Sequence, residues 1–308
     1  DEYDSAFFDK RPKFLNYFPY YLIINNIEFD HSDIYRDIDQ IKDGFRKLIR
    51  CIPEKGLILA NGDDPVVKEV LTPVYSDLQT FGKSPACNWR FETSRIDFSG
   101  THFTVTRNRE QLGEFQIPLY GEFQLYNSLA VIALALNLGI PQEKIRQGLR
   151  TFQNVKRRLE FWGKLNGADF YDDFAHHPTA VRETLRALKM KHPDQKLIAV
   201  FEPRTNTTVR NIFQEELAAS LSLADVVILT PLHRAARIPE QQRLSLDKLA
   251  SDLKAKETEV VLLKTYAAVH KTLRPLANSE SVVVLMTNGN LGGEYEILQG
   301  SVKQSREK

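Results

Sequence analysis

The second half of the chain alternates strand-like and helix-like segments, and this alternation limits its fold more than any other feature. The strand-like segments are the apolar runs "ADFYDD", "KLIAVFEP", "DVVILTP", "EVVLLK" and "SVVVLMT". Helical patterns lie between them near residues 178–190, 211–223, 245–255 and 266–274. Strand–helix–strand units of this kind place parallel strands in one sheet through right-handed crossovers. The pattern therefore predicts a doubly wound, Rossmann-like domain with helices on both faces of a parallel sheet.

The carboxyl ends of such strands meet at one edge of the sheet, where ligands bind in folds of this class. Eight residues, nearly all polar, fall at these ends: Asp172, Asp173, Glu202, Arg204, Thr230, His233, Asn288 and Gly289. Loops are polar in many proteins that bind nothing there. The convergence indicates a functional edge without identifying its ligand.

The first half of the chain mixes element types. Residues 20–27 predict a buried strand, and the spacing of apolar residues over 34–48 predicts an amphipathic helix. The segment "GLILANGDDP" predicts a strand and a turn, and short alternating runs within residues 78–120 predict a small antiparallel region. The apolar segment "YNSLAVIALALNLGI" predicts a buried helix. The whole chain is therefore expected to be α/β.

Length and composition narrow the class of protein. The chain has 308 residues, about twice a typical domain, so we expect two domains. Its net charge of +1 gives no general attraction to nucleic acid, and no apolar run approaches the roughly 20 residues that span a bilayer. Cys51 and Cys87 form no close motif, which favours a reducing cytosol. We therefore expect a cytoplasmic protein that neither binds nucleic acid nor inserts into a membrane.

The segment "YDDFAHHPTA" carries the densest group of titratable residues. Asp172 and Asp173 end a strand, and Pro178 suits the first turn of the helix that follows. One aspartate could hold a ribose, a metal-bound water or a base, and His176 or His177 could pair with a negative group. The simpler explanation is an aspartate that caps the helix, with histidines in a polar loop. A zinc site is a weak alternative, because adjacent histidines do not easily share one tetrahedral site.

A second group, "NNIEFDHSD" at residues 25–33, combines oxygen-rich side chains with one imidazole. This composition suits a Mg²⁺ ion that keeps water or phosphate ligands. Helix capping by Ser32 or Asp33 explains the segment equally well.

Two basic segments complete the set of candidates. Arg157 and Arg158 lie where the two halves join, where an arginine can bind phosphate bidentately, although a solvated basic pair is the simpler explanation. Arg204, with Asn206 and Thr207 close behind it, would suit a carboxylate ligand or form an ordinary turn. No G-x-x-x-x-G-K-[ST] phosphate loop occurs in the sequence.

These segments occur in an order that resembles the Mur ligase family of peptidoglycan synthesis. The ordered set is "DEYDSAFFDKRPKF", "INNIEFDHSDIY", "YNSLA", "VKRRLEFWG", "YDDFAHHPTAV" and "FEPRTNT", and the resemblance runs from residue 1 to about residue 298. It implies that residues 1–157 are the second part of a central ATP-binding domain and that residues 158–308 are the C-terminal domain. It also implies that a UDP-binding domain, the phosphate loop and a metal-binding glutamate precede residue 1. We therefore expect residues 1–308 alone to be inactive.

The resemblance also implies roles for single residues. His31 matches the family's Mg²⁺-binding histidine, and Asn127 matches an asparagine that contacts adenine. Arg158 matches an arginine that reaches the ATP phosphates, and Asp173 an aspartate that helps to hold the nucleotide once the C-terminal domain closes. The amino-acceptor side would comprise Arg204, Asn206 and Thr207. We also expect His177, in the loop after Asp173, to bind substrate. The segment "GEFQLYN" departs from the family's G-x-H-N-x-x-N pattern.

The activity implied is ATP-dependent amide formation in the bacterial cytoplasm, during peptidoglycan recycling and cell-wall biogenesis. UDP-N-acetylmuramate would be joined to the tripeptide L-Ala-γ-D-Glu-meso-diaminopimelate through an acyl phosphate, with ATP and Mg²⁺ as cofactors. The segment "DDFAHHP" also resembles the branch of the family that adds L-alanine, whereas "EYDSAFFDKR" and "EPRTNT" favour the tripeptide branch. Two alternatives from other classes are a non-catalytic binding module and a metal-dependent hydrolase. The hydrolase would be centred on Asp172, Asp173, His176 and His177.

Overall fold

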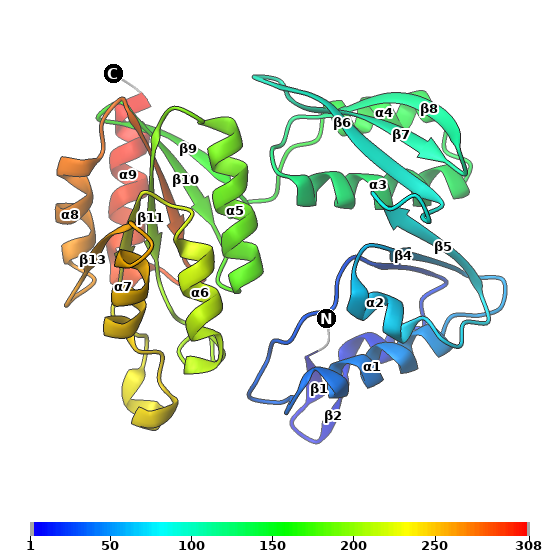
Figure 1. Ribbon diagram of the computed structural model, residues 1–308, viewed down its shortest axis with the longest axis horizontal. Helices are drawn as coiled ribbons and strands as arrows, with labels where there is room; N and C mark the ends of the chain where they lie inside the picture. Colours follow the sequence, from blue (N-terminus) through cyan, green and yellow to red (C-terminus); the bar gives the residue numbers. More distant parts are fainter. Residues whose placement is uncertain (1–2, 307–308) are drawn as a thin grey trace. The chain divides into compact units, whose positions relative to one another are not determined.

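The computed structural model describes residues 3–306, and the chain divides into two compact units after Gln153 (Figure 1). We call them unit 1 and unit 2. The first two letters of the "DEYD" motif lie outside the described residues. The domain boundary expected between residues 157 and 158 concerns the domains of the family and stays a prediction.

Unit 1 is built on a six-stranded sheet in the order β3-β4-β5-β6-β7-β8. The strands are β3 (Tyr21–Ile24), β4 (Leu57–Asn61), β5 (Asp77–Gly82), β6 (Trp89–Asp97), β7 (Gly100–Arg107) and β8 (Glu110–Ile117). The antiparallel region expected over residues 78–120 is confirmed for β6 to β8. It is wrong for β5, which pairs in parallel with both β4 and β6. A short hairpin of β1 (Asp4–Ala6) and β2 (Asp9–Pro12) precedes the sheet.

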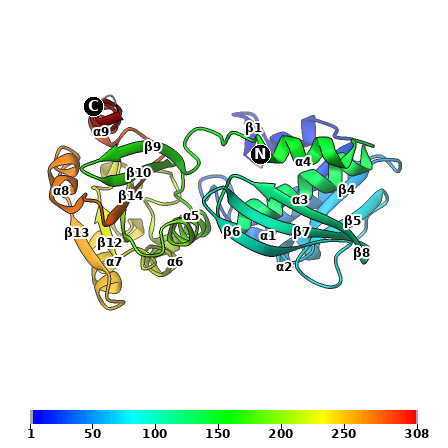
Figure 2. The ribbon, with the colours of Figure 1, turned by 90° about the horizontal axis from the view of Figure 1, so that it is seen from above.

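Helices cover both faces of this sheet (Figures 1 and 2). One face packs against α1 (Ile38–Arg50) and α2 (Pro65–Val70), and the other against α3 (Glu122–Asn137) and α4 (Gln142–Arg150). The apolar side of α1 is buried through Ile41, Leu48 and Ile49. Capping of this helix by Ser32 or Asp33 is wrong, because α1 begins at Ile38 and Asp37 accepts the amide hydrogen of Gln40.

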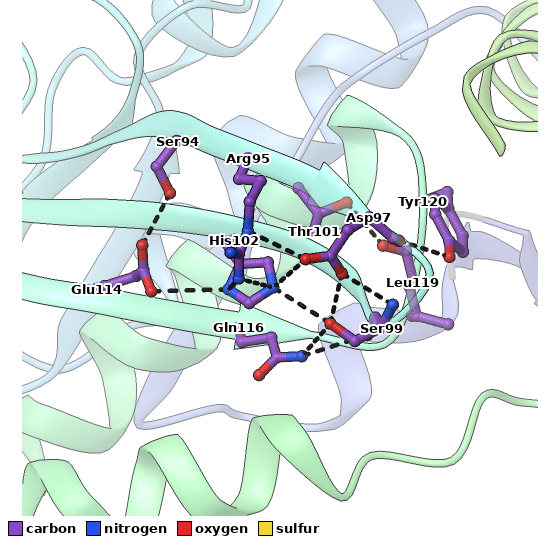
Figure 3. A network of polar contacts seen from close by, with 10 residues as sticks. All are labelled: Ser94, Arg95, Asp97, Ser99, Thr101, His102, Glu114, Gln116, Leu119 and Tyr120. Carbon is purple, nitrogen blue, oxygen red and sulfur yellow. Dashed lines mark hydrogen bonds and ion pairs between the residues drawn. The ribbon is translucent and has the colours of Figure 1, made fainter. Parts of the chain in front are cut away.

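A polar network closes the hairpin between β6 and β7 (Figure 3). Ser99 donates to Asp97 over 2.5 Å, and His102 Nε2 lies 3.2 Å from the Ser99 hydroxyl. Gln116 on β8 donates to the same hydroxyl over 2.9 Å. Gly100, at φ 118°, begins β7, and a Cβ there would lie 2.1 Å from a main-chain oxygen of β8. Because the serine hydroxyl donates to Asp97, it does not donate to His102 as a serine nucleophile donates to its base, and the network serves to hold the turn.

Unit 2 is built on a second six-stranded sheet in the order β13-β12-β11-β14-β10-β9. The strands are β9 (Glu160–Leu165), β10 (Ala168–Asp173), β11 (Lys196–Phe201), β12 (Val226–Leu229), β13 (Glu259–Leu262) and β14 (Ser281–Met286). Strands β10 to β14 are parallel, which confirms the expected sheet. The antiparallel edge strand β9 was not predicted, because its sequence follows the polar stretch "QNVKRRLE".

The winding of unit 2 reverses once. The helices α5 (Pro178–Lys191), α6 (Gln214–Leu221) and α7 (Leu246–Lys254) share one core, whereas α8 (Ala268–Leu276) and α9 (Glu294–Arg306) belong to the core on the opposite face (Figure 2). The chain returns through α8 to place β14 between β11 and β10. Neighbouring strands at β14 therefore lead to helices on opposite faces, and their carboxyl ends form the crevice in which such folds bind ligands.

None of the helices within residues 3–306 combines the length and the apolar character that crossing a bilayer requires.

Candidate functional site

Four polar side chains are buried at the carboxyl ends of β10, β14 and β11, which lie side by side. Asp172 and Asp173 end β10, Thr287 follows β14 and Glu202 follows β11. Asp173 is 4% exposed and the other three are 0% exposed. A buried carboxylate is costly unless hydrogen bonds or charges compensate it, so the partners of these side chains show how the edge is built.

Arg157 ties the start of unit 2 to this edge. Its Nη2 donates to the main-chain oxygens of Thr287 and Gly289, the second over 3.2 Å. Its guanidinium lies over two aromatic rings, at 5.1 Å from the centroid of Phe174 and 5.0 Å from that of Tyr295. The planar fork of arginine suits paired carbonyl oxygens and stacking at the same time. Arg157 is therefore held on three sides by protein groups.

Asp172 faces α9 and is shared by a cation and a phenol. Its Oδ2 accepts the hydroxyl of Tyr295 and lies 3.4 Å from Arg157 Nε. Burial raises the pKa of Asp172 to about 6, although the hydrogen bond from Tyr295 and the charge of Arg157 oppose that change. Burial and the neighbouring Asp172 raise the pKa of Tyr295 in turn. Asp172 therefore changes charge at a far higher pH than an exposed aspartate.

Asp173 points to the opposite face of the strand, as successive strand residues do. Its carboxylate accepts the amide hydrogens of Leu159 and Ala175, each over 2.7 Å, and the hydroxyl of Thr184 on α5 over 3.2 Å. Burial raises the pKa of Asp173, while these hydrogen bonds and the charge of Arg158 act in the opposite direction. Both oxygens of the carboxylate bind the protein itself, so Asp173 fixes the backbone on either side of the strand end.

Arg158 is exposed and stands between two residues in left-handed conformations. Arg157 has φ 59° and Leu159 has φ 48°, and such a conformation costs a residue other than glycine about 1–3 kcal/mol. Hydrogen bonds hold the segment on both sides, from Phe174 N to Arg157 O over 2.8 Å and from Leu159 N to Asp173. The Arg158 guanidinium lies 5.5 Å from the Phe174 ring. A strained and anchored segment thus presents an exposed guanidinium, which suits a phosphate.

Glu202 forms a second cluster at the same edge. It accepts the Thr287 hydroxyl and lies 3.1 Å from Arg204 Nη1. A Cβ at Gly289 would lie 2.5 Å from Arg204 Cζ, so the absence of a side chain there makes room for the guanidinium. The buried carboxylate therefore fixes the orientation of a partly exposed arginine.

Two titratable groups lie near this cluster. Burial and the charge of Glu202 raise the pKa of Tyr266 to about 12, and its hydroxyl donates to Pro231 O over 3.1 Å. Burial, Arg204 and Arg234 lower the pKa of His233. His233 is therefore biased toward the neutral form that can accept a proton or a hydrogen bond.

The other residues expected to bind substrate differ in their surroundings. His177 is the N-cap of α5, where its Nδ1 accepts the amide hydrogen of Thr179 over 3.4 Å. The expected aspartate cap of this helix is therefore wrong. Asn206 is exposed, whereas Thr207 is only 2% exposed. The substrate-binding role of His177 and the acceptor roles of Asn206 and Thr207 stay predictions.

In unit 1, Asn127 on α3 is tied to the carboxyl ends of β3 and β4. Asn25 follows β3 and donates from Nδ2 to Asn127 Oδ1 over 3.1 Å. Asn61 ends β4 and donates to the main-chain oxygen of Asn25 over 2.8 Å. Two segments singled out separately in the sequence, "INN" and "YNSLA", thus meet.

Asp63 is a residue of this edge that the sequence analysis missed. It accepts the amide hydrogens of Lys83 and Ser84, over 2.5 and 3.0 Å, and the Tyr126 hydroxyl over 2.8 Å. The signal was present as the acidic turn "NGDDP" directly after a strand, which we interpreted as a turn alone. Asp63 joins β4, β5 and α3 around the asparagines.

His31 lies in the loop after β3 with φ 53°. Its amide donates to Asp30 Oδ1 over 2.7 Å, and its ring lies edge-on to Tyr3 with centroids 4.7 Å apart. Across residues 3–306, no three His, Cys, Asp or Glu side chains come together as a metal site. A Mg²⁺ ion at His31 would take oxygen ligands from phosphate and water, as Mg²⁺ sites commonly do.

The metal-dependent hydrolase alternative gains no support from the geometry. The carboxylates of Asp172 and Asp173 face opposite sides of β10, where they accept hydrogen bonds from Tyr295 and from backbone amides, so the two do not converge on one point. His176 Nδ1 lies 3.0 Å from the main-chain oxygen of Phe174.

Sequence models of two protein domains match the chain. The Mur ligase middle domain matches residues 9–135, and the glutamate ligase domain of Mur ligases matches residues 157–289. The chain belongs to the Mur ligase family. The resemblance stated from the motifs is thereby confirmed, and so is an α/β fold of the Mur ligase type.

Relatives within the Mur ligase family differ in the acceptor that their names give. A Haemophilus influenzae protein named UDP-N-acetylmuramate–L-alanyl-γ-D-glutamyl-meso-2,6-diaminoheptandioate ligase is 35% identical over 98% of this chain. A Desulfitobacterium hafniense protein named UDP-N-acetylmuramate–L-alanine ligase is 36% identical over 78% of it. The crystal structure of a murein peptide ligase from Psychrobacter arcticus is 31% identical with a TM-score of 0.68, and the alignment covers 98% of this chain and 61% of that one.

This Mur ligase chain spans 64% of the length of the Haemophilus relative and 53% of the Desulfitobacterium relative. The activity, substrates and partners of the whole protein are therefore proposals. The roles of Arg158, Asp173, Asn127 and His31 in ligand binding likewise stay predictions.

Proposed function

We propose that this Mur ligase chain is part of an ATP-dependent ligase that joins UDP-N-acetylmuramate to the tripeptide L-Ala-γ-D-Glu-meso-diaminopimelate. One observation carries the proposal: the 35% identity to a relative of that name extends over 98% of the chain. Relatives named as L-alanine ligases match with either less coverage or lower identity, at 36% over 78% of the chain or 32% over 92% of it. We place the reaction in the bacterial cytoplasm, where ATP is available, and within peptidoglycan recycling.

The reaction has two steps. The muramate carboxylate attacks the γ-phosphorus of ATP, ADP leaves and an acyl phosphate forms. The amine of the tripeptide then attacks the acyl carbon, so that an amide bond forms while inorganic phosphate and a proton leave. Bound Mg²⁺ would neutralise charge on the phosphoryl group being transferred.

In unit 2, we assign Arg158 to the ATP phosphates. The support is its exposure beside the Phe174 ring and the strained, anchored backbone on both sides. Asp173 would maintain that backbone through Leu159, and Arg204, oriented by Glu202, would bind a carboxylate of the acceptor peptide.

In unit 1, we assign Asn127 to the nucleotide base, because its amide is held by Asn25 at the carboxyl end of the parallel strands. His31 would supply one ligand to Mg²⁺, with the other positions taken by phosphate and water oxygens.

The test uses the purified full-length gene product with ATP, Mg²⁺ and UDP-N-acetylmuramate. ADP release and the mass of the amide product are measured with the tripeptide or with L-alanine as acceptor. The proposal expects product from the tripeptide and at least about tenfold lower kcat/KM for L-alanine. Preference for L-alanine would instead establish the second candidate, and ATP-independent turnover would contradict both.

Arg158→Ala tests the phosphate contact within that reaction. Loss of an arginine that stabilises transferred phosphate lowers turnover by roughly 10³-fold, with folding unchanged because the side chain is exposed. Arg150→Ala, which removes an exposed arginine in the last turn of α4, is the matched control. Wild-type turnover in Arg158→Ala would remove this residue from the mechanism.

A further inference from the structure

The proposed reaction gives no task to Arg157, Asp172 and Tyr295, although they are bound closely to one another. We call these three residues, with the main-chain oxygens of Thr287 and Gly289, the Arg157 clamp. Tyr295 binds Asp172, Asp172 faces Arg157, and Arg157 donates to the two oxygens after β14. The clamp thus links α9, β10 and the end of β14.

The clamp is an energetically costly way to fill the interior of unit 2. Asp172 is 0% exposed, and its Oδ1 has no hydrogen-bond partner among the described residues. Arg157 Nε is buried at 3.4 Å from Asp172, which is an ion pair without a hydrogen bond. Apolar residues of similar size often stabilise a protein as well as a buried ion pair does. Here the carboxylate is fully buried and the arginine side chain is 28% exposed, and the arrangement points to a requirement for one defined conformation.

That conformation belongs to the segment that carries Arg158. The clamp fixes the Arg157 side chain, and Phe174 N fixes its carbonyl oxygen over 2.8 Å. On the other side, Asp173 fixes the amide of Leu159. Both flanking residues are left-handed, with φ 59° and 48°, so the segment would relax to other conformations without these bonds. Holding it in advance spares a ligand the entropy of ordering it.

We propose that Tyr295 and Asp172 are positioning residues that act through Arg157 to hold Arg158 ready for the phosphate groups of a nucleotide. This inference rests on the phosphate contact proposed above for Arg158. It adds that residues on α9 and β10, outside the proposed phosphate contact, set the affinity for ATP.

Tyr295→Phe is the most selective variant, because it removes the hydroxyl and keeps the ring over Arg157. In the full-length gene product, we expect KM for ATP to rise about tenfold, which corresponds to the loss of one hydrogen bond to a charged group, with a smaller change in KM for the acceptor. Tyr171→Phe is the matched control. It removes a hydroxyl on β10, the strand that carries Asp172, which lies 3.0 Å from His192 Nε2 and outside the clamp.

A double-mutant cycle separates positioning from general loosening of the fold. If Tyr295 acts through Arg158, Tyr295→Phe should change KM for ATP in the wild type and leave it unchanged in the Arg158→Ala background. Equal effects in both backgrounds would overturn the proposal. If Arg158→Ala alone leaves KM and kcat for ATP unchanged, the phosphate contact itself fails. That single variant reveals this failure without reference to Tyr295, and it overturns the positioning role as well.

A second measurement needs neither ATP nor ligase activity. Trypsin can cut after Lys156 and Arg158, both of which are exposed. We expect Tyr295→Phe to raise the rate of cleavage in this segment about fivefold or more, because cleavage follows the population of the opened segment, and Tyr171→Phe to leave the rate unchanged. An unchanged rate in Tyr295→Phe would overturn the proposal.

Discussion

Asp63 in unit 1 and Asp173 in unit 2 make the same kinds of hydrogen bond in different surroundings. Each lies at the carboxyl end of a parallel strand and accepts main-chain amides and a hydroxyl group. The donors to Asp63 are Lys83, Ser84 and Tyr126, and those to Asp173 are Leu159, Ala175 and Thr184. Asp63 is partly buried, whereas Asp173 is 4% exposed.

The backbone next to each carboxylate also differs between the two units. Gly82 approaches Asp63 so closely that a Cβ would lie 2.5 Å from Oδ2, and glycine makes this approach free of strain. Beside Asp173, the left-handed positions are occupied by Arg157 and Leu159, for which that conformation is costly. Unit 1 uses a glycine where the chain must approach closely. Unit 2 keeps larger side chains under strain next to Arg158, which is typical of functional segments.

The largest expected effect is that of removing each carboxylate. Asp173→Ala leaves the buried amide of Ala175 and the partly buried amide of Leu159 without acceptors, at about 1–3 kcal/mol each, so we expect a loss of roughly 4 kcal/mol in the free energy of unfolding. Asp63→Ala should cost roughly half as much, because water can reach the amides of Lys83 and Ser84. Urea denaturation of both variants, analysed with a common m-value, measures the difference.

The comparison fails if the two variants lose the same free energy, since burial would then have no influence. Asp173→Asn is the informative control. It keeps one acceptor oxygen, so it should recover part of the stability while the amide of Leu159 is held less firmly and turnover of the full-length gene product still falls.

The second expected effect is a dependence of stability on pH that comes from Asp172. Its pKa rises from the ordinary 3.8 to about 6 in the folded protein. Between these values the folded state holds a proton that the unfolded state has lost, so stability falls as pH rises from about 4 to about 6. The difference corresponds to at most roughly 3 kcal/mol.

The charged neighbours of Asp172 define the control. Arg157 and Tyr295 oppose the rise in its pKa, whereas Glu160 and Asp173 add to it. Asp172→Asn should flatten the slope of unfolding free energy against pH in this window, and Tyr295→Phe should move the upper end of the window to higher pH. A slope that Asp172→Asn leaves unchanged would mean that another carboxyl group causes it.

Hydrophobic patterning predicted the architecture of unit 2 well. The five parallel strands and the helices between them follow from apolar runs and their spacing, and β10 occupies the expected residues 168–173. Strand β9 and helix α9 were missed, because "EFWGKL" and "EYEILQGSVKQSR" mix polar and apolar residues without a clear period. Residues 77–82 were assigned to the wrong kind of pairing, since a strand's sequence does not state the direction of its partner.

The sequence predicted where the candidate site lies in the fold, but it did not predict which of its side chains bind one another. The strand ends indicated Asp172, Asp173 and Glu202, but Tyr295 lies more than 120 residues from Asp172. The spacing of residues in the sequence did not distinguish Arg157 from Arg158. Left-handed backbone and burial distinguish them in the structure, because Arg157 turns inward to main-chain oxygens and Arg158 stays exposed. Such differences depend on tertiary contacts that no local pattern contains.

A smaller effect is expected when the glycine beside Asp63 is replaced by alanine and the strained leucine beside Arg158 is replaced by glycine. Gly82→Ala forces a Cβ against Asp63 and should cost about 1–3 kcal/mol. Leu159→Gly removes the strain of φ 48° but also removes packing against the core of unit 2, so its stability should change by less than about 1 kcal/mol. The added freedom should nevertheless raise KM for ATP in the full-length gene product.

Thermal unfolding and ATP kinetics of the same two proteins provide the measurement. Gly82→Ala is expected to act on stability, and Leu159→Gly on nucleotide affinity. The interpretation of the strained segment is contradicted if Leu159→Gly is as active as the wild type at every ATP concentration.

The smallest effect is expected in the network around His102. This network contains the residue types of a catalytic site, but its hydrogen bonds run in a different direction. Ser99, Asp97 and His102 lie within hydrogen-bond range of one another (Figure 3). The serine proton goes to Asp97, and the residues close a hairpin turn. His102→Ala should therefore cost about 1 kcal/mol of stability, the usual net value of a hydrogen bond, and leave ATP kinetics unchanged. His102→Gln, which can keep a bond to Ser99, should cost less. A fall in kcat without a fall in melting temperature would show that this network acts on the reaction, and the direction of the serine hydrogen bond would then not distinguish a structural network from a functional one.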